Sequence, residues 1–399
     1  MNSSPNYLIL GAGQQGVAVA IDVALFGEPA KIILADGMPG AAARAATRIS
    51  RTLSPKIRRK TALEAVNLNV QDQKQLTTLF KKAQTVLSAL PYYLNPQMAM
   101  AAIRAKIHYC DLGGYFDSTK KILLLDKEAR KAGVTLIPDC GVSPGMCNSL
   151  ALCGMEKLDI TQTVKIYCGG LPQRPQPPLN YRIVFNLEGV LGNYFGSSYI
   201  LKNGRIVLAQ SLTQRETVNL GAPLGRLEAA ITGGATSTCP WSHKGRVQNY
   251  IYKTLRYPGH YEKIDLLKSL GVLETEPVKV QGQMVSPRKL FVEVAGPKLK
   301  LGTGRDLLAL VVEVTGKKNK KNITIRYQVL DYFDPKTKLT AMQRTTGFSS
   351  AIFLEALAQG KIIPKGVVPV EKAMPGSIFL REIRRRGIEV KESVRSPKL

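Results

Sequence analysis

The sequence has few residues that could hold a metal ion or form a disulfide framework. Its 399 residues include three histidines and six cysteines, and no two cysteines form a C-x-x-C pair. Structural zinc sites usually draw closely spaced ligands from these two residue types. We therefore expect no metal site. We expect packing thiols at all six positions, because free cysteine behaves as a small hydrophobic residue: Cys110, Cys140, Cys147, Cys153, Cys168 and Cys239.

Long uninterrupted apolar segments are also missing. The longest apolar stretch near the start, residues 7–26, contains Gln14, Gln15 and Asp22, whereas a transmembrane helix needs about 20 consecutive apolar residues. A secretory signal would show a basic segment before its apolar region and a small-residue cleavage site after it. Neither pattern is present, so we expect a chain without a membrane span, located in the cytoplasm.

Acidic residues are scarce relative to basic ones. The chain has 56 lysines and arginines against 29 aspartates and glutamates, a net charge of +27. Such an excess can indicate nucleic-acid binding. Here, however, the basic residues form short clusters at residues 56–60, 317–321 and 384–386, without interleaved aromatic residues. We expect a basic surface and no nucleic-acid partner.

The first 140 residues alternate between two patterns. Short apolar runs without polar alternation are typical of strands buried on both faces, and the segments between them have helical periodicity. The connections are short, as in doubly wound α/β folds with a parallel sheet. The predicted strands are residues 7–10, 31–35, 65–68, 86–90, 108–112 and 134–138, and the predicted helices are residues 71–83, 95–106, 118–132 and 144–158.

Beyond residue 163 the pattern changes to strand-like runs separated by turns rich in glycine and proline. We expect a second, α+β domain built on a mixed sheet. Residues 171–179 contain four prolines and are predicted to form an extended loop. A helical pattern at residues 349–359 ends at Gly360, and the charged last dozen residues are expected to fray. The predicted strands are residues 164–168, 205–207, 278–281, 290–294, 308–315 and 324–330.

A glycine-rich motif follows the first predicted strand. Gly11, Gly13 and Gly16 form a G-x-G-x-x-G pattern between this strand and a helical segment at residues 17–26. In dinucleotide-binding folds the first glycine permits a tight turn, the second lets the backbone approach the pyrophosphate, and the third allows close helix packing. The pyrophosphate would lie at the helix N-terminus, beside Gln14 and Gln15.

A carboxylate at the end of the second predicted strand indicates which dinucleotide is bound. Asp36 stands twenty residues after Gly16, where a carboxylate accepts hydrogen bonds from the ribose hydroxyls of NAD and disfavours the 2′-phosphate of NADP. Arg44 and Arg48 follow closely in sequence, so NADP remains the alternative. The other strands end at the same sheet edge, and the further residues expected to contact the cofactor are Ala89, Leu90, Pro91, Asp111, Gly141 and Pro144.

Several longer motifs resemble those of a known family. Residues 111–114 (DLGG) and 137–148 (IPDCGVSPGMCN) are similar to motifs of the saccharopine dehydrogenase family. Residues 185–191 (FNLEGVL), 232–238 (TGGATST) and 252–260 (YKTLRYPGH) are similar to its lysine 6-dehydrogenase branch. The likeness extends from residue 7 to about residue 380. The chain departs from the family pattern after the TGG motif, at Cys239, Pro240 and Trp241.

The resemblance implies both an architecture and a reaction. It implies a Rossmann domain at residues 1–143, a catalytic and oligomerisation domain at residues 144–343, and a helix in residues 344–399 that returns to the first domain, before a basic tail. The implied reaction is NAD-dependent oxidative deamination of the ε-amine of L-lysine to allysine, which cyclises to Δ1-piperideine-6-carboxylate. It also implies a homo-oligomer, a dimer or larger.

Lysine needs a cation for its α-carboxylate and anions for its amines. Arg256 could grip the carboxylate with two hydrogen bonds, or it could form a surface or interdomain ion pair. Glu188 lies among apolar residues, where burial would raise the pKa of a carboxyl toward that of a usable base. It could hold or deprotonate the ε-amine, or be paired structurally.

Other side chains are weaker candidates. Asp111 ends a predicted strand at the ligand edge and could hold an ammonium group, as could Asp139, for which turn formation is the favoured role. His260 is a second candidate base, with a core position as its alternative. The residues that could line the substrate pocket, each with plain packing as its alternative, are Tyr92, Tyr93, Tyr115 and Asn148.

Two other functions remain open. A reductase that joins an aldehyde and an amino acid into a secondary amine, as saccharopine or carboxynorspermidine enzymes do, would share the hydride chemistry. Its substrate carries a second carboxylate and would need another cation where this chain offers Glu188. The other possibility is a non-catalytic Rossmann protein that binds anionic partners through its basic surface; such binding would weaken steeply with salt.

Overall fold

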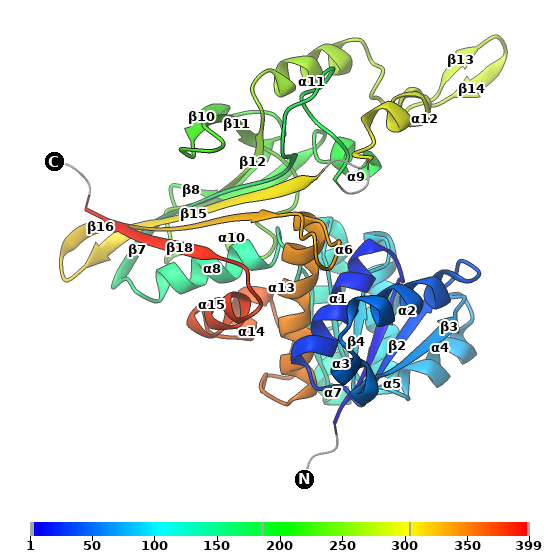
Figure 1. The fold of residues 1–399 in the computed structure, drawn as a ribbon. Helices are drawn as coiled ribbons and strands as arrows, with labels where there is room; N and C mark the ends of the chain where they lie inside the picture. The colour runs from blue at the N-terminus through cyan, green and yellow to red at the C-terminus, as the bar shows by residue number, and fades with distance from the viewer. Residues whose placement is uncertain (1–3, 185–186, 303–304, 397–399) are drawn as a thin grey trace.

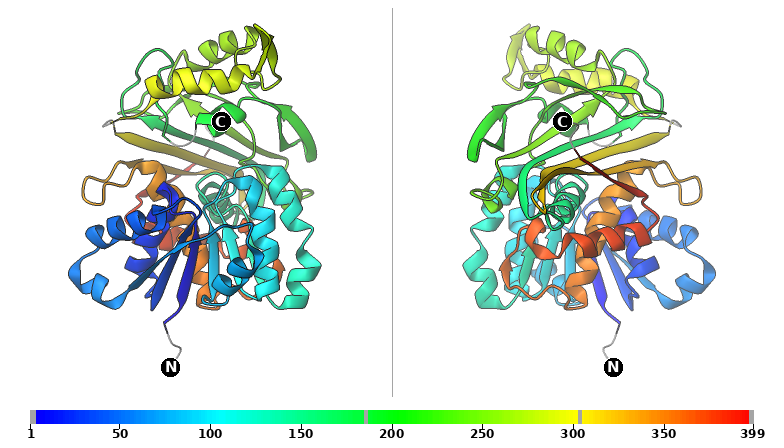
Figure 2. Two further views of the ribbon diagram at one scale, coloured as in Figure 1. Left: turned by 90° about the vertical axis from the view of Figure 1, so that its right-hand side faces the viewer. Right: turned by 90° about the vertical axis from the view of Figure 1, so that its left-hand side faces the viewer.

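Two sheets organise the chain. A computed structural model describes residues 4–184, 187–302 and 305–396. A parallel sheet lies near the N-terminus and a larger mixed sheet lies across it, with the C-terminal helices beneath the mixed sheet (Figures 1 and 2). No helix in these described ranges is long and apolar enough to span a membrane.

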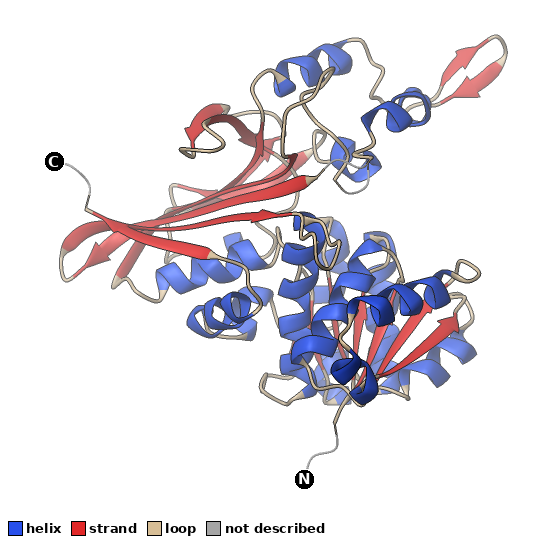
Figure 3. Cartoon of the chain, in the orientation of Figure 1, coloured by secondary structure: helices blue, strands red, loops and turns tan. Residues whose placement is uncertain are grey.

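The first sheet is seven-stranded and parallel, in the order β17-β6-β5-β4-β1-β2-β3, with helices on both faces (Figure 3). The order reverses beside β1, which is where doubly wound sheets bind ligands. The strands are β1 (Asn6–Leu10), β2 (Lys31–Asp36), β3 (Ala62–Asn67), β4 (Thr85–Ser88), β5 (His108–Asp111), β6 (Thr135–Ile137) and β17 (Gly366–Val367).

The helices of this part of the chain lie close to the predicted ones. The doubly wound fold class is confirmed, although the single helix predicted at residues 118–132 is two helices, α6 and α7. The elements are α1 (Gln14–Phe26), α2 (Ala41–Thr52), α3 (Pro55–Lys60), α4 (Gln73–Phe80), the 3₁₀ turn η1 (Tyr92–Leu94), α5 (Asn95–Ala105), α6 (Phe116–Leu123), α7 (Asp126–Ala132) and α8 (Met146–Met155).

The second sheet is mixed, as predicted. Its main path is β10-β11-β12-β7-β15-β16-β18, with β8 pairing to β12 and β9; the β12–β7 pair is parallel and the others are antiparallel. The strands are β7 (Ile160–Pro172), β8 (Ser197–Lys202), β9 (Arg205–Gln210), β10 (Glu216–Asn219), β11 (Arg226–Ile231), β12 (Asn249–Arg256), β15 (Asp306–Lys318), β16 (Lys321–Tyr332) and β18 (Val390–Arg395).

Smaller elements surround this sheet. A separate hairpin, β13 (Val278–Val280) and β14 (Gln283–Val285), projects from the body of the molecule (Figure 1). The helices are α9 (Leu187–Gly192), α10 (Cys239–Ser242), α11 (His260–Ser269), α12 (Pro287–Leu299), α13 (Ala341–Ala358), α14 (Val370–Ala373) and α15 (Gly376–Arg385).

Two predictions for this part of the chain are wrong. Residues 290–294, predicted as a strand, lie within α12, which begins with Pro287 in its first turn, a favourable position for proline. The tail does not simply fray, because Val390–Arg395 pair with β16 as an edge strand. All but the first residue of β18 are exposed, so this strand carries no apolar pattern that would have revealed it.

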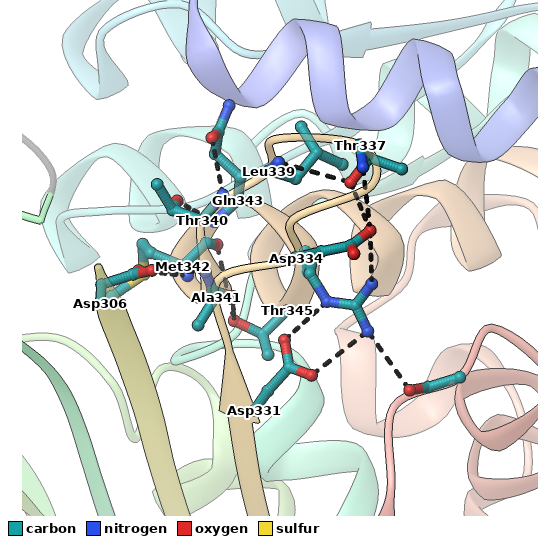
Figure 4. A network of polar contacts seen from close by, with 12 residues as sticks. Asp306, Asp331, Asp334, Thr337, Leu339, Thr340, Ala341, Met342, Gln343 and Thr345 are labelled. Atoms are coloured by element: carbon teal, nitrogen blue, oxygen red, sulfur yellow. Dashed lines mark hydrogen bonds and ion pairs between the residues drawn. The ribbon is translucent and has the colours of Figure 1, made fainter. Parts of the chain in front are cut away.

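Helix α13 joins the two sheets. At its N-terminus the buried Asp306 of β15 accepts hydrogen bonds from the backbone N–H groups of Ala341 (2.8 Å) and Met342 (3.0 Å), and Thr340 caps the first turn (Figure 4). Further along, the helix packs so closely against α1 that a Cβ atom on Gly347 would lie 2.7 Å from Ala18. The predicted return of a C-terminal helix to the first domain is therefore confirmed.

A buried cluster of charges fastens the end of α15 to the first domain. The Arg386 guanidinium donates to Asp22 of α1 (2.9 Å), Glu355 of α13 (2.6 Å) and Glu382 (3.0 Å), and the side chains of Arg386 and Asp22 are fully buried. Burial raises the pKa of Asp22 well above its usual range, and the Arg386 charge opposes this shift. The two buried carboxylates therefore depend on one cation.

Removing that cation should destabilise the fold. Loss of one partner of a buried ion pair costs about 3–5 kcal/mol because the remaining charge is uncompensated. We expect Arg386→Met to lower the free energy of unfolding by this amount in urea titrations. Arg385→Met is the matched control, since Arg385 shares the Phe26 ring contact with Arg386 but its ion pair, with Glu382, is exposed; equal stability of the two variants would contradict the assignment.

Candidate functional site

The glycine-rich loop after β1 has one open position and two crowded ones. Gly11 has φ +94°, a backbone conformation that residues with a side chain rarely adopt. A Cβ atom on Gly16 would lie 1.9 Å from the carbonyl oxygen of Gly11. In contrast, a Cβ atom on Gly13 would meet no atom within 4 Å. Gly11 and Gly16 are thus required by the turn and by helix packing, while Gly13 faces free space.

The N-terminus of α1 suits an anionic ligand. Gly13 caps the helix without a side-chain hydrogen bond, and the first turn carries no acidic residue, so its N–H groups and dipole are available to negative charge. Gln15 Oε1 is also buried with no hydrogen-bond partner among the described residues, but as an acceptor it suits a donor group of a ligand and not the pyrophosphate. These features fit a dinucleotide whose pyrophosphate lies over Gly13 and Gln14.

Asp36 lies beside this loop at the end of β2. Its carboxylate accepts hydrogen bonds from the backbone N–H groups of Ala12 and Met38, both at 2.8 Å. Each oxygen retains a free lone pair for a ribose hydroxyl. Of the two nearby arginines, Arg44 donates to Pro39 O (3.3 Å), and Arg48 donates to Lys338 O (3.3 Å) in the loop before α13.

The other predicted cofactor residues follow neighbouring strands. Gly11 packs tightly on Ala89, whose carbonyl oxygen would lie 2.8 Å from a Cβ atom at position 11. Gly141 packs similarly on the loop after β5, since its Cβ atom would lie 2.6 Å from Leu112 O. The loops holding these residues therefore meet at the carboxyl edge of the parallel sheet: Ala89, Leu90, Pro91, Asp111, Gly141 and Pro144.

Two aspartates are buried at this edge. Asp111 accepts hydrogen bonds from Gly113 N (2.8 Å), Asp139 N (3.0 Å) and Tyr109 Oη (3.1 Å). Burial raises the pKa of Asp111 to about 6, and burial with repulsion from Asp111 raises the pKa of Asp139 to about 7. Both oxygens of Asp111 accept hydrogen bonds from protein donors. This geometry favours a structural role, in which Asp111 holds the loops after β5 and β6, rather than the binding of an ammonium group.

Three tyrosines lie exposed near these loops. The Tyr92 ring lies 5.6 Å from that of Tyr115 and 5.9 Å from that of Tyr93, and all three side chains are accessible to solvent. A Cβ atom on Gly114 would lie 3.0 Å from Cβ of Tyr92. The structure thus brings together the tyrosines predicted to line a pocket, on loops that follow β4 and β5.

Arg256 is buried at the end of β12, with 3% of its surface exposed. Its guanidinium carbon lies 4.8 Å from the ring centre of Tyr181 and 5.8 Å from that of Tyr194, to whose hydroxyl Nε donates (2.9 Å). Nη1 donates to Leu255 O (2.9 Å), while Nη2 donates to no described residue. No carboxylate of the described chain lies within 4 Å, and the Tyr181 hydroxyl beside it is also buried without a partner.

His260 is held in the same cluster. Nδ1 lies 2.8 Å from Leu179 O and Nε2 lies 2.9 Å from the Tyr194 hydroxyl. Because a carbonyl oxygen can only accept, Nδ1 carries the proton and Nε2 accepts from Tyr194. Burial and the nearby Arg256 charge lower the pKa of His260 to about 3. This geometry favours a neutral histidine that orients Tyr194 over a base that reaches substrate.

Asn148 is engaged on both sides of its amide. Oδ1 accepts from Gly145 N (2.9 Å), and Nδ2 donates to the Tyr250 hydroxyl (3.1 Å) and towards Ala235 O (3.4 Å). The side chain is 1% exposed. It therefore links α8 to β12 and to the loop after β11, and this geometry favours the helix-interior alternative.

Glu188 differs from expectation. The apolar motif at residues 185–191 predicted a buried carboxylate, but Glu188 is exposed in the first turn of the short helix α9, whose apolar residues Leu187, Val190 and Leu191 point inward. The carboxylate of Glu188 is therefore not buried, and that part of the prediction is wrong. Residues 185 and 186 of the motif lie outside the described residues.

The sequence did not reveal three residues of these clusters. Tyr181, Tyr194 and Ser237 contribute to the surroundings of Arg256 and Asp139 from positions far along the chain. The tyrosines follow no motif, and only the TGG motif pointed to the region of Ser237. Among the described residues, no group of three or more histidine, cysteine or acidic side chains could hold a metal ion, and all six cysteines are buried and free.

Comparisons with known proteins agree on one family. The family profile described as the saccharopine dehydrogenase C-terminal domain matches residues 141–388. The profile described as the saccharopine dehydrogenase NADP binding domain matches residues 7–137. Among solved structures, apo saccharopine dehydrogenase (L-Glu forming) from Saccharomyces cerevisiae superposes with a TM-score of 0.79 over 98% of this chain and 100% of that one, at 19% identity, which shows a shared fold.

Curated relatives are longer than this chain. The mitochondrial alpha-aminoadipic semialdehyde synthase of Rattus norvegicus is 28% identical over 254 residues, which cover 60% of this chain and 27% of the relative. The saccharopine dehydrogenase (NADP(+), L-glutamate-forming) of Saccharomyces cerevisiae is 23% identical over 278 residues, which cover 68% of this chain and 60% of the relative. The matched part is thus roughly a quarter of the rat protein.

The two kinds of glycine in the loop after β1 should respond differently to substitution. We expect Gly13→Val to remain folded, because its side chain enters free space, and to lose dinucleotide binding, because that space is where the pyrophosphate approaches. Gly16→Val should fail to fold normally, because its Cβ atom would overlap the Gly11 carbonyl. Circular dichroism and dinucleotide titration of both variants check this; normal dinucleotide affinity in folded Gly13→Val would remove the assignment.

Proposed function

The chain belongs to the saccharopine dehydrogenase family, and we propose that it is an NAD-dependent oxidoreductase that oxidatively deaminates the ε-amine of L-lysine. The product would be allysine, which cyclises to Δ1-piperideine-6-carboxylate. Two features support the proposal: a loop suited to a dinucleotide at the edge of the first sheet, and a buried cation in the second domain that has no anionic partner among the described residues.

The observation that carries the proposal is the state of Arg256. A buried charge is costly unless it is paired, yet the Arg256 guanidinium has no described carboxylate within 4 Å and an unused Nη2 group. Stacking on Tyr181 and Tyr194 orients the planar group. A substrate α-carboxylate would complete this site with the paired hydrogen bonds that arginine makes to carboxylates.

The reaction requires a neutral amine and a path for hydride. A bound nicotinamide would supply the acceptor for the hydride that leaves the carbon carrying the amine. A proton leaves the nitrogen, and water then replaces the resulting imine nitrogen, which departs as ammonia. Arg256 would hold the carboxylate end. Glu188, whose carboxylate has no partner among the described residues, is the proposed acceptor of the amine proton.

A second candidate reaction is suggested by the relatives. One of them is a saccharopine dehydrogenase that forms L-glutamate, so a secondary amine with a second carboxylate is the alternative substrate. That substrate would need a second cation in the site. Initial rates of NADH and NADPH formation across lysine, saccharopine and polyamines separate the two; activity confined to saccharopine would overturn the lysine assignment.

Asp36 should make NAD the preferred cofactor. Its carboxylate is available to the ribose hydroxyls and repels a 2′-phosphate, so we expect NAD to bind about tenfold more tightly than NADP, or about 1.4 kcal/mol. Asp36→Ala should narrow this difference. Arg44→Ala, in the helix α2 that follows Asp36, is the matched control, because loss of NADP binding in that variant alone would assign a 2′-phosphate to Arg44. Titration showing tighter NADP binding in the unmodified protein would reverse the preference.

Arg256 should govern substrate affinity. We expect Arg256→Ala to raise KM for lysine by about 10- to 100-fold, or about 1.4–3 kcal/mol, with cofactor affinity unchanged, and Arg256→Lys to recover part of the loss, since it offers a point charge only. Arg288→Ala is the control: Arg288, in the first turn of α12, is also buried and has no carboxylate partner within the described part of the chain, but it donates to Leu273 O (2.7 Å). A similar KM for lysine in the Arg256→Ala and Arg288→Ala variants would contradict the role of Arg256 in binding the α-carboxylate.

A further inference from the structure

Three loops from two domains meet at the carboxyl edge of the parallel sheet. Two belong to the first domain: residues 112–115 after β5 and residues 138–145 after β6. The third, residues 232–238, leaves β11 of the second domain and carries the TGG motif. A Cβ atom on Gly234 would lie 3.4 Å from Gly114 O, and Ser237 Oγ donates a hydrogen bond to Asp139 Oδ2.

Asp139 is fixed from several sides. Its carboxylate also accepts from Thr119 of α6, whose hydroxyl lies 3.1 Å and 3.0 Å from the two oxygens, and its backbone N–H donates to Asp111 (3.0 Å). Position 113 must be glycine beside it, because a Cβ atom there would lie 2.4 Å from Asp139 Oδ1. The carboxylate is therefore a rigid acceptor for Ser237.

Both ends of the Ser237–Asp139 contact have unusual backbones. Asp139 has φ +67° and Ser237 has φ +47°, and each is 2% exposed. Residues other than glycine rarely adopt a positive φ. Where they do, the surrounding structure holds them in this conformation, and such residues cluster at functional sites. The contact is thus maintained at a conformational cost.

The second-domain loop is held by a row of three hydroxyls. Thr236 Oγ1 donates to Tyr199 O (2.7 Å) and Thr238 Oγ1 donates to the buried Glu371 carboxylate (2.8 Å), while Ser237 between them reaches Asp139. At the start of the loop, Thr232 hydrogen-bonds Thr254 (2.6 Å), two residues before Arg256. The loop at residues 232–238 therefore connects the surroundings of Arg256 to the carboxyl edge of the parallel sheet, where the glycine-rich loop after β1 also lies.

We propose that Ser237 is a positioning residue: its hydrogen bond to Asp139 fixes the loop at residues 232–238, and with it the proposed substrate site of the second domain, relative to the carboxyl edge of the first sheet. This inference rests on the proposed oxidoreductase function. Misplacement of reacting atoms by about 1 Å can cost about 100-fold in rate, so a contact that touches neither substrate nor cofactor can control turnover.

The test compares two hydroxyls on the same carboxylate. Ser237→Ala removes the contact between domains, whereas Thr119→Val removes a contact within the first domain. We expect kcat to fall about 10- to 100-fold in Ser237→Ala, with KM for the amine and the dinucleotide Kd within twofold of the unmodified protein, and Thr119→Val to keep kcat within threefold. Near-normal kcat in Ser237→Ala, or equal losses in both variants, would overturn the proposal.

A third variant separates positioning from stability. Glycine favours positive φ, so Ser237→Gly relieves the backbone while removing the hydroxyl. We expect it to be at least as thermally stable as Ser237→Ala and to show the same loss of kcat. Recovery of kcat in Ser237→Gly would mean that backbone strain, and not the hydrogen bond, caused the loss, and would also overturn the proposal.

Hydrogen exchange of the loop amides gives a readout that needs no substrate. Amides of residues 232–238 should exchange faster in Ser237→Ala and Ser237→Gly than in Thr119→Val, because only the first two lose the contact to Asp139. If the unmodified protein oxidises no amine, the proposed function fails while this comparison still tests the contact. Equal exchange in the three variants would overturn the proposal in either case.

Discussion

The arrangement of the two domains depends on the capping of α13 by Asp306. This carboxylate belongs to β15 of the second sheet and binds the first free N–H groups of a helix that packs on α1 of the first domain. From the same helix, Gln343 Nε2 donates to Gln14 O (2.9 Å). The N-terminus of the cofactor helix is therefore tied directly to the sheet that carries Arg256, and a shift of either domain would strain this junction.

Most of the first domain could be predicted because burial on both sheet faces produces continuous apolar runs. Strands such as β1 and β2 lie within a residue or two of their predicted ends. The same reasoning failed at residues 290–294, since a short apolar run does not distinguish a strand from a helix, and Ser286 and Pro287 supply a helix start instead. It also missed β18, whose mostly exposed residues pair through the backbone alone.

The candidate site was predictable only where local sequence determines it. The glycines of the loop after β1 act through their own backbone, so Gly11, Gly13 and Gly16 were identifiable from spacing. The environment of Arg256 comes from Tyr181 and Tyr194, more than 60 residues away, and the second-domain partner of Asp139 is Ser237, 98 residues away. Glu188 shows that apolar neighbours in sequence do not guarantee burial. The short helix α9 turns its apolar residues to one side and the Glu188 carboxylate to the other.

Two buried arginines, Arg386 and Arg256, have different electrostatic surroundings. Arg386 is surrounded by Asp22, Glu355 and Glu382, and the cluster connects α1, α13 and α15. Arg256 is buried to a similar degree but has aromatic rings and a carbonyl oxygen as its neighbours. Desolvating a cation without an anion opposes folding, so Arg256 is an expensive residue for stability alone. If a substrate carboxylate binds there, as we propose, it would supply the missing negative charge.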